Sequence, residues 1–364
     1  MKRVLLVAHI SELPGPVQLL SDYFQQQSAD FYRMYFPIDG VKIYQSSFYH
    51  GQHLLVKKKS KTMGARRYLS DLGRTLIWIG KIPKPIDKAV GTNCLAVLPL
   101  IVFKKFLRIR QVVFFTSDFA RRRFANRFQN WLYVALDKFC ALRADKVCCN
   151  SQRTLKARAS EGVPTAKMVH TPNGVYFKEI GRIDYRQKKF SRKILFIGYI
   201  SPERGLQNII KLLPKIKIKL EVIGSGQYEG ELKKLARSLK ISHRVKFMGL
   251  KPHPAVIAYL KKFSGFGLAP YSLKGDDTDW IKYCDPIKVK EYLACFIPVI
   301  ISDMPEIASQ IREKKLGYVY QNEKEARQIL KKIAFLGEND YRQMLKNIAQ
   351  VRDNFDLTNI YNRV

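Results

Sequence analysis

The sequence predicts an α/β protein of two domains, each built on a parallel sheet covered by helices. Short β-rich runs alternate with helical stretches along the 364 residues, as expected when crossover helices join parallel strands. A polar, basic stretch at residues 179–192 separates two such series and predicts an interdomain linker. The length and the 46% hydrophobic content allow two cores and exclude a wholly disordered chain.

The first series occupies residues 1–178. Continuous apolar runs predict buried strands at Val4–Ala8, Phe31–Phe36, Val112–Thr116 and Lys146–Cys149. Helical spacing predicts helices at Pro16–Gln27, where proline suits the first turn, and at Arg127–Leu142. The turn signal Thr-Pro-Asn-Gly at residues 171–174 closes the series.

The second series occupies residues 193–340 and repeats the alternation. Strands are predicted at Ile194–Ile197, Lys219–Ile223, Val245–Phe247, Gly265–Leu268 and Val299–Ile301. Helices are predicted between them at Leu206–Leu213, Tyr228–Leu239 and Ile287–Cys295. A helical segment at residues 341–364 is expected to pack back towards the first domain. Two open α/β sheets that face each other predict a shared ligand cleft at the carboxyl ends of their strands.

Composition places the chain in a reducing compartment. The best apolar run, Cys94–Phe103, is shorter than the roughly 18 residues that a membrane-spanning helix needs. The apolar run after the basic N-terminus lacks a cleavage site and predicts a first strand rather than a signal peptide. Six scattered cysteines form no paired motif. We therefore expect a cytoplasmic protein, soluble or peripheral.

The net charge of +35 is the strongest bulk signal. Residues 1–190 carry most of the excess, with 34 Lys and Arg against 12 Asp and Glu. Such a charge predicts a polyanionic partner, either nucleic acid or an anionic membrane face. A solvated, lysine-rich surface is the alternative interpretation.

Residues that suit a nucleotide cluster in the second domain. Its first strand is followed by Gly198, which lets a ligand approach the backbone, and by Arg204 at a helix start, a natural diphosphate site. Lys288 and Glu291 share one helix face and could meet a phosphate and the ribose hydroxyls. A ligand-free surface arginine and an ordinary i,i+3 salt pair are the alternatives.

Motif order decides between these interpretations, because residues 193–306 resemble the nucleotide-sugar-binding domain of glycosyltransferase family 4. PIKVKEYLACFIPVIISD (286–303) resembles the family's P-x-K-x-x-E-Y-L-A block, and SPERG (201–205) resembles its loop after the first strand. RVKFMGLKPHPAVIAYL (244–260) also fits, and ADKVCCNS (144–151) with GVPTAKMVHTPNGV (162–175) resembles the run into the linker. The resemblance covers most of the chain beyond about residue 110 and implies the GT-B architecture of two Rossmann-like domains facing a cleft.

The resemblance implies roles for particular residues of the donor domain. Glu291 would hold the ribose hydroxyls of a nucleotide-sugar donor, and backbone near Gly249 and Leu250 would flank the base. Arg204 and Lys288 would neutralise the diphosphate and so act in catalysis, without a metal or a further cofactor. Three residues depart from the family pattern, which usually has arginine, glutamate and glycine at these places: Tyr199, Cys284 and Phe296.

In the first domain, the resemblance implies that Gly15 belongs to a loop facing the donor. Asp118 follows the strand at 112–116, where many members have a histidine contacting the sugar. Asp118 is a candidate base, or a candidate acceptor of a hydrogen bond from a sugar hydroxyl, with capping of the strand end as the alternative. Family members retain anomeric configuration, so retention is expected here.

An interfacial helix is a further hypothesis for the first domain. Basic residues precede an apolar helical face that includes an aromatic residue, Trp78, and they are Lys57, Lys58, Lys59, Arg66 and Arg67. An ordinary core-facing helix has the same pattern. With the resemblance, this predicts an envelope glycosyltransferase that is peripheral on the inner face of the cell membrane, with a lipid-linked or polysaccharide acceptor.

Two other functions are weighed against this one. A nucleotide-sugar epimerase of the same fold would need paired catalytic carboxylates and histidines, which the sequence does not show. A nucleic-acid-binding protein would explain the basic charge, but it would need a recognisable module or a stacking platform. Neither is found in the sequence, so no nucleic-acid partner is expected.

Overall fold

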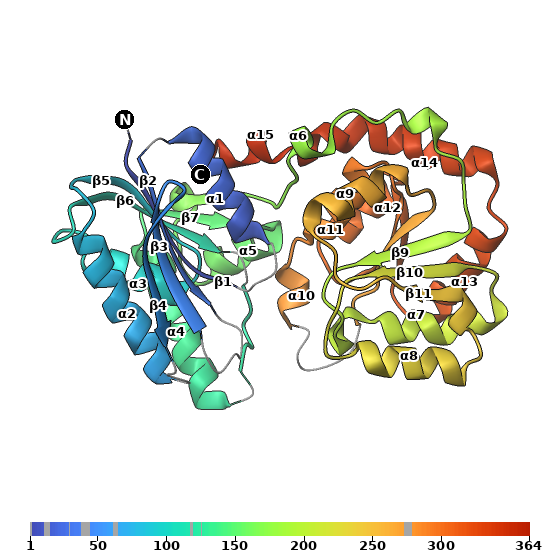
Figure 1. Ribbon diagram of the computed structural model, residues 1–364, viewed down its shortest axis with the longest axis horizontal. Coiled ribbons are helices and arrows are strands. Elements are labelled where there is room, and N and C mark those ends of the chain that lie inside the picture. The colour runs from blue at the N-terminus through green and yellow to red at the C-terminus, as the bar shows by residue number, and fades with distance from the viewer. Residues whose placement is uncertain are drawn as a thin grey trace. The chain divides into compact units, whose positions relative to one another are not determined.

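A computed structural model describes residues 2–10, 15–28, 30–37, 44–60, 65–116, 119–124, 126–272 and 279–364. The chain forms two compact units. Unit 1 comprises Met1–Pro172 with Tyr361–Val364, and unit 2 comprises Asn173–Ile360. Each is an α/β domain with its own sheet and core, as predicted (Figure 1).

Unit 1 is built on an eight-stranded sheet of order β4-β3-β2-β1-β5-β6-β7-β8. Its strands pair in parallel except for β2–β3 and β3–β4, which are antiparallel. The strands are β1 Val4–Ile10, β2 Phe31–Pro37, β3 Tyr44–His50, β4 His53–Ser60, β5 Ile86–Gly91, β6 Ile109–Thr116, β7 Lys146–Cys149 and β8 Met168–His170.

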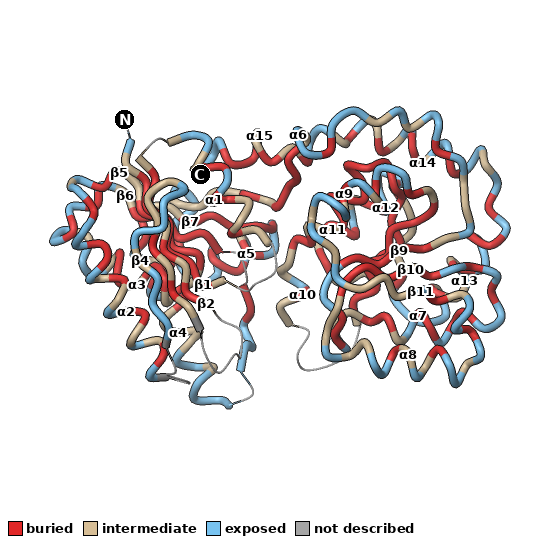
Figure 2. Tube along the Cα trace, in the orientation of Figure 1, coloured by how far each residue is buried: buried red, intermediate tan, exposed pale blue. Residues whose placement is uncertain are grey.

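Helices cover both faces of this sheet (Figure 1). They are α1 Pro16–Gln27, α2 Ala65–Gly80, α3 Cys94–Val102, α4 Arg127–Arg143 and α5 Gln152–Ser160. Helix α3 contacts both α2 and α4, so these three share a face. The central strands are buried on both sides (Figure 2), which is why their sequences are continuous apolar runs rather than alternating ones.

Unit 2 has a parallel six-stranded sheet of order β11-β10-β9-β12-β13-β14. The strands are β9 Lys193–Ile197, β10 Lys219–Ile223, β11 Val245–Phe247, β12 Phe266–Ala269, β13 Val299–Ser302 and β14 Gly317–Tyr320. The order reverses at β9, which places β10 on one side of it and β12 on the other. Ligands bind at such reversals in open α/β sheets, outside the carboxyl ends of the strands.

The helices of unit 2 follow from this winding. Helices α7 and α8 lie on one face of the sheet and α9, α11 and α12 on the other (Figure 1). The helices are α6 Phe177–Ile180, α7 Leu206–Leu212, α8 Glu229–Ser238, α9 His253–Lys262, α10 Asp279–Tyr283, α11 Ile287–Ala294, α12 Ile307–Glu313, α13 Glu323–Ala334, α14 Glu338–Val351 and α15 Leu357–Tyr361.

The observed units depart from the expected domain boundaries. The stretch expected to be a linker at 179–192 is packed into unit 2, where the Lys188 ammonium donates to the carbonyl oxygen of Phe263 at 2.7 Å. Helix α14 also belongs to unit 2, because the Tyr341 side chain is buried against Gly265 and Phe266. Only the last four residues of the segment 341–364 join unit 1.

Helix α2 corrects the expectation of an interfacial helix around Trp78. The Trp78 side chain is only 3% exposed and stacks on Phe36 and Phe48. Arg67 is buried as well, while Arg66 is exposed. An amphipathic pattern does not say whether core or lipid covers the apolar face. Here the core covers Trp78, so the core-facing alternative holds for this face. Within the described residues, no helix is long and apolar enough to cross a bilayer.

Candidate functional site

The candidate site lies in unit 2, where the strand order reverses between β9 and β12. Gly198 follows β9, and Tyr271 lies just beyond the end of β12. Helix α11 contacts β12 and carries Lys288 and Glu291 on its first two turns. Residues separated by about 90 positions in the sequence therefore meet at one edge of the sheet, as the rule for parallel sheets requires.

Two glycines keep this edge open. Gly198 has a φ of 122°, and a Cβ on it would lie 3.2 Å from the Lys288 ammonium nitrogen. Gly224, after β10, has a φ of 141°, and a Cβ there would lie 2.0 Å from the carbonyl oxygen of Gly198. Positive φ and close backbone approach both require glycine at these positions. The turn at Gly198, which the sequence marked as a ligand approach, and the neighbouring turn at Gly224 are therefore built for bare backbone.

The half-buried Lys288 side chain lies among aromatic rings. Its ammonium lies 3.9 Å from the centroid of the Phe196 ring and 5.7 Å from that of Tyr271. Burial, with the nearby Arg204 guanidinium, holds the pKa of Lys288 well below its ordinary value. Glu291 acts in the opposite direction. Without an anion, the charged form is therefore poorly stabilised, and a bound diphosphate would supply the missing counter-charge.

Arg204 is packed beside the same aromatic residues. It ends the 3₁₀ turn Pro202–Arg204, just before α7. Its guanidinium carbon lies 4.7 Å from the centroid of the Trp280 ring and 5.6 Å from that of Tyr271. Stacking on aromatic faces orients a planar guanidinium while leaving its edge for an anion. Arg204 and Lys288 thus share Tyr271 as a neighbour, and they place two cations at one end of the sheet.

Glu291 is buried, with 7% of its surface exposed, and its partner is a histidine. The Nε2 atom of His253, the first residue of α9, lies 2.7 Å from Oε1 of Glu291. The other ring nitrogen of His253 lies 3.6 Å from a carboxylate oxygen of Glu179. Sequence reasoning missed His253. The helix-start pattern Lys-Pro-His-Pro was visible, but its distance to Glu291 was not.

The His253–Glu291 pair predicts a pH-dependent contribution to stability. The hydrogen bond to Glu291 raises the pKa of His253 above its ordinary value, against an opposing effect of burial. Because the pKa is raised in the folded state, the stabilisation is fully present below about pH 6.5, the pKa of unfolded histidine. It is lost as the pH rises through the folded-state pKa. We expect the melting temperature of the wild type to fall relative to that of His253→Gln over this rise. If the melting temperatures of the two proteins change in parallel with pH, the His253–Glu291 pair is not the cause of the pH dependence.

Helix α11 is fixed to the sheet by Tyr292. Its hydroxyl donates to the carbonyl oxygen of Leu195 at 2.9 Å and accepts from the amide of Ile197 at 2.9 Å. A Cβ on Gly267 in β12 would lie 2.4 Å from this ring, so glycine makes room for it. Because both β9 and β12 hold Tyr292, the adjacent Glu291 has a fixed position. Fixed side chains are what a preorganised site needs.

The remaining donor-side residues fall at the same edge. Gly249 has a φ of 69°, its carbonyl oxygen accepts from the amide of Gly224 at 2.9 Å, and Leu250 beside it is exposed.

Phe296, at the family's usual glycine position, takes up a φ of 55° shortly after the end of α11. Its ring stacks on Tyr185 at 4.7 Å, so packing maintains the left-handed conformation that glycine would adopt freely. The turn is therefore kept despite the departure.

The predicted residues of unit 1 that the structure describes lie on separate elements. Gly15 precedes α1 as its N-cap, and its amide donates to the side-chain oxygen of Gln18 at 2.9 Å. Asp118 lies outside the described residues. Lys57, Lys58 and Lys59 are exposed on β4, the edge strand of the sheet. Lysines on an edge strand protect it from pairing with other strands. Their role on a membrane therefore stays a prediction.

Comparison with known proteins adds family and fold. Residues 178–352 match the family described as glycosyl transferases group 1. An alpha-monoglucosyldiacylglycerol synthase of Streptococcus pneumoniae is 25% identical over 196 residues, which are 49% of this chain and 42% of that protein. The matched region thus spans less than half the length of this curated relative.

Solved structures share the fold over nearly the whole chain. HepE of Anabaena in complex with UDP has a TM-score of 0.70 at 14% identity, with 99% of this chain and 97% of that one covered. WaaG, a glycosyltransferase involved in lipopolysaccharide biosynthesis, has a TM-score of 0.73 at 14% identity, with the same coverage. A glycosyltransferase of Rickettsia africae has a TM-score of 0.68 at 14% identity, over 100% and 96% of the two chains. These likenesses confirm the predicted fold of two Rossmann-like domains of the GT-B type.

Proposed function

From the match of residues 178–352 to the glycosyl transferases group 1 family, we propose that the chain transfers a sugar from a nucleotide-sugar donor to a glycolipid or polysaccharide acceptor. The observation that carries the proposal is the meeting of two cations and one carboxylate at the reversal of the unit 2 sheet. Lys288 and Arg204 lie beside Tyr271, and Glu291 lies one helical turn from Lys288.

Each of these groups has one role in the proposed transfer. The bond between the anomeric carbon and the diphosphate oxygen breaks, and the acceptor oxygen forms the new glycosidic bond while its proton is released. Negative charge grows on the departing nucleoside diphosphate, where Lys288 and Arg204 stabilise it without a metal. Glu291 accepts hydrogen bonds from the ribose hydroxyls and so holds the donor. Backbone at Gly198 leaves room for the phosphates.

Named relatives support particular donors and acceptors. HepE is solved with UDP and with UDP-glucose, which makes a UDP-sugar the first donor to test here. The pneumococcal relative is a diacylglycerol glycolipid synthase, and WaaG acts in lipopolysaccharide biosynthesis. Both names support an envelope glycolipid or glycan as acceptor, and we propose that the transfer takes place at the inner membrane face. The alpha linkage in the relative's name supports retention of an α-configured donor, which NMR of the product's anomeric proton would decide.

Replacement of Glu291 by alanine tests the donor site. Loss of charged hydrogen bonds of about 1.5–3 kcal/mol each is expected to weaken UDP binding about 10- to 100-fold and to abolish detectable transfer. Calorimetric titration with UDP and the UDP-induced rise in melting temperature measure the first effect. Hydrolysis or transfer assays with UDP-glucose measure the second.

A matched control guards against a general loss of structure. Glu313→Ala removes an exposed carboxylate at the last residue of α12 in the same unit, and it should leave UDP binding unchanged. The melting temperature without nucleotide reports whether Glu291→Ala folds. If folded Glu291→Ala binds UDP as tightly as the wild type, the assignment of the ribose site is refuted.

A further inference from the structure

Unit 1 displays an unusual amount of apolar surface. Twelve of the fifteen exposed large apolar side chains among the described residues belong to it. Four of them lie on a single helix, α4, and we call them the outer stripe: Phe128, Trp131, Leu132 and Phe139. Phe128 is 69% exposed and Trp131 63% exposed. Monomeric proteins rarely leave such a contiguous aromatic patch without a partner.

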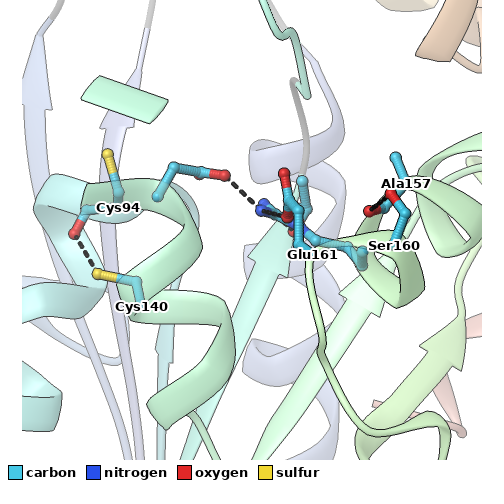
Figure 3. Close-up of polar contacts among 8 residues, drawn as sticks. Cys94, Cys140, Ala157, Ser160 and Glu161 are labelled. Carbon is cyan, nitrogen blue, oxygen red and sulfur yellow. Dashed lines mark hydrogen bonds and ion pairs between the residues drawn. The ribbon is translucent and has the colours of Figure 1, made fainter. Parts of the chain in front are cut away.

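The geometry of α4 makes the outer stripe continuous. Its positions follow the i, i+3, i+4 spacing that aligns side chains along one face of a helix. The rings of Phe128 and Trp131 stack with centroids 5.9 Å apart. The opposite face is anchored in unit 1, where the Cys140 thiol donates to the carbonyl oxygen of Cys94 (Figure 3). The stripe is therefore turned outward by the same packing that fixes the helix.

Cations border the outer stripe. We call them the basic rim: Arg121, Arg122, Arg127, Lys138 and Arg143. The only acidic residue between 121 and 143 is Asp137, which is buried and paired with Arg158 inside the domain. A cavity of about 640 Å³ opens beside Trp131 and is lined by four residues of the basic rim, namely Arg121, Arg122, Arg127 and Lys138. An anionic group could enter it next to the aromatic ring.

We propose that the outer stripe and basic rim of α4 form the surface by which unit 1 docks on an anionic lipid bilayer, with the helix lying in the interfacial plane. Aromatic and aliphatic side chains flanked by Lys and Arg are the composition of helices that bind this way. The cavity beside Trp131 would receive an anionic headgroup. The proposal rests on the proposed function, and it assigns the membrane contact to α4 in place of the Trp78 region of α2.

Charge complementarity favours a bilayer over two other occupants. A second copy of the chain would bring two basic rims together, and the like charges would repel. Nucleic acid would neutralise the cations and its bases could stack on the aromatic rings, but the aliphatic side chain of Leu132 would remain exposed. An anionic bilayer satisfies both features at once, since headgroups neutralise the basic rim and acyl chains cover the stripe.

Vesicle co-sedimentation of the full chain tests this surface. Wild type is expected to bind phosphatidylcholine vesicles containing phosphatidylglycerol and to bind pure phosphatidylcholine weakly. The double variant Phe128→Ser/Trp131→Ser should bind the anionic vesicles at least about tenfold more weakly. Each charge removed from the rim, as in Arg122→Gln or Lys138→Gln, should weaken binding about fivefold.

The matched control is Leu69→Ser/Ile77→Ser on α2, which removes two side chains of similar exposure, 70% and 65%. It should bind vesicles as the wild type does. The proposal is overturned if this control loses binding while the α4 double variant keeps it, or if the wild type binds no anionic vesicle. It is also overturned if the α4 variant alters only dimer formation or only oligonucleotide binding.

A separate measurement distinguishes failure of the docking surface from failure of the transferase proposal. The UDP-induced rise in melting temperature depends on unit 2 and should survive in the α4 variant, which also shows that the variant is folded. If vesicle binding fails but the UDP response remains, the docking surface is wrong and the transferase proposal stands. If the UDP response is absent from a wild type that binds vesicles, the transferase proposal fails instead.

Discussion

Replacement of Lys288 by methionine is expected to lower the rate of sugar transfer by about 10²- to 10³-fold without destabilising the protein. The loss follows because, in the proposed mechanism, Lys288 is a cation at the position where diphosphate charge develops. The expected lack of destabilisation has a separate cause. Burial beside Phe196 and the charge of Arg204 lower the pKa of Lys288, so the ligand-free fold holds this ammonium at a cost that methionine removes.

These opposite signs make the experiment informative. The transfer rate with UDP-glucose gives the first quantity, and thermal unfolding without ligand gives the second. Lys211→Met on α7 removes an exposed lysine from the same unit and should change neither. A Lys288→Met protein that transfers sugar at the wild-type rate would show that this ammonium does not act on the diphosphate. A large fall in melting temperature would show that Lys288 is structural.

Replacement of Arg158 by methionine is expected to destabilise unit 1 by about 3–5 kcal/mol. Arg158 in α5 is fully buried and pairs with Asp137 of α4 and with Glu161, whose carboxylate lies 3.0 Å away (Figure 3). Although burial alone would lower it, the pKa of Arg158 lies above its usual range because both carboxylates adjoin it. Removing the guanidinium leaves those two acids unpaired inside the protein.

Urea unfolding of Arg158→Met measures this loss, and Lys156→Met, an exposed position on the same helix, is the matched control. Asp137→Asn in the Arg158→Met background should recover part of the lost free energy, since it removes one unpaired charge. If Arg158→Met were as stable as the control, the buried ion pairs would contribute nothing. Because Asp137 lies on the inner face of α4, this cluster also holds the outer stripe in place.

The sequence by itself determined the series of strands and helices and the segments that carry the proposed donor site. Apolar runs located β1, β6, β9 and β10, since strands buried on both faces must be continuously apolar. The spacing of Lys288 and Glu291 placed them on one face of α11, because helical periodicity is a local property. The antiparallel strands β3 and β4 were missed, as their polar and basic residues give no buried-strand signal.

Only the tertiary structure decided which side chains meet and which faces are covered. His253 and Glu291 are 38 positions apart, and no local pattern joins them. Trp78 and Trp131 both lie on helices with an apolar face, yet one is 3% and the other 63% exposed. Periodicity states which residues share a face, whereas the neighbouring elements decide whether protein covers it. For that reason the sequence hypothesis placed an interfacial face at Trp78, which the core covers, while the proposed donor site could be located from its motifs.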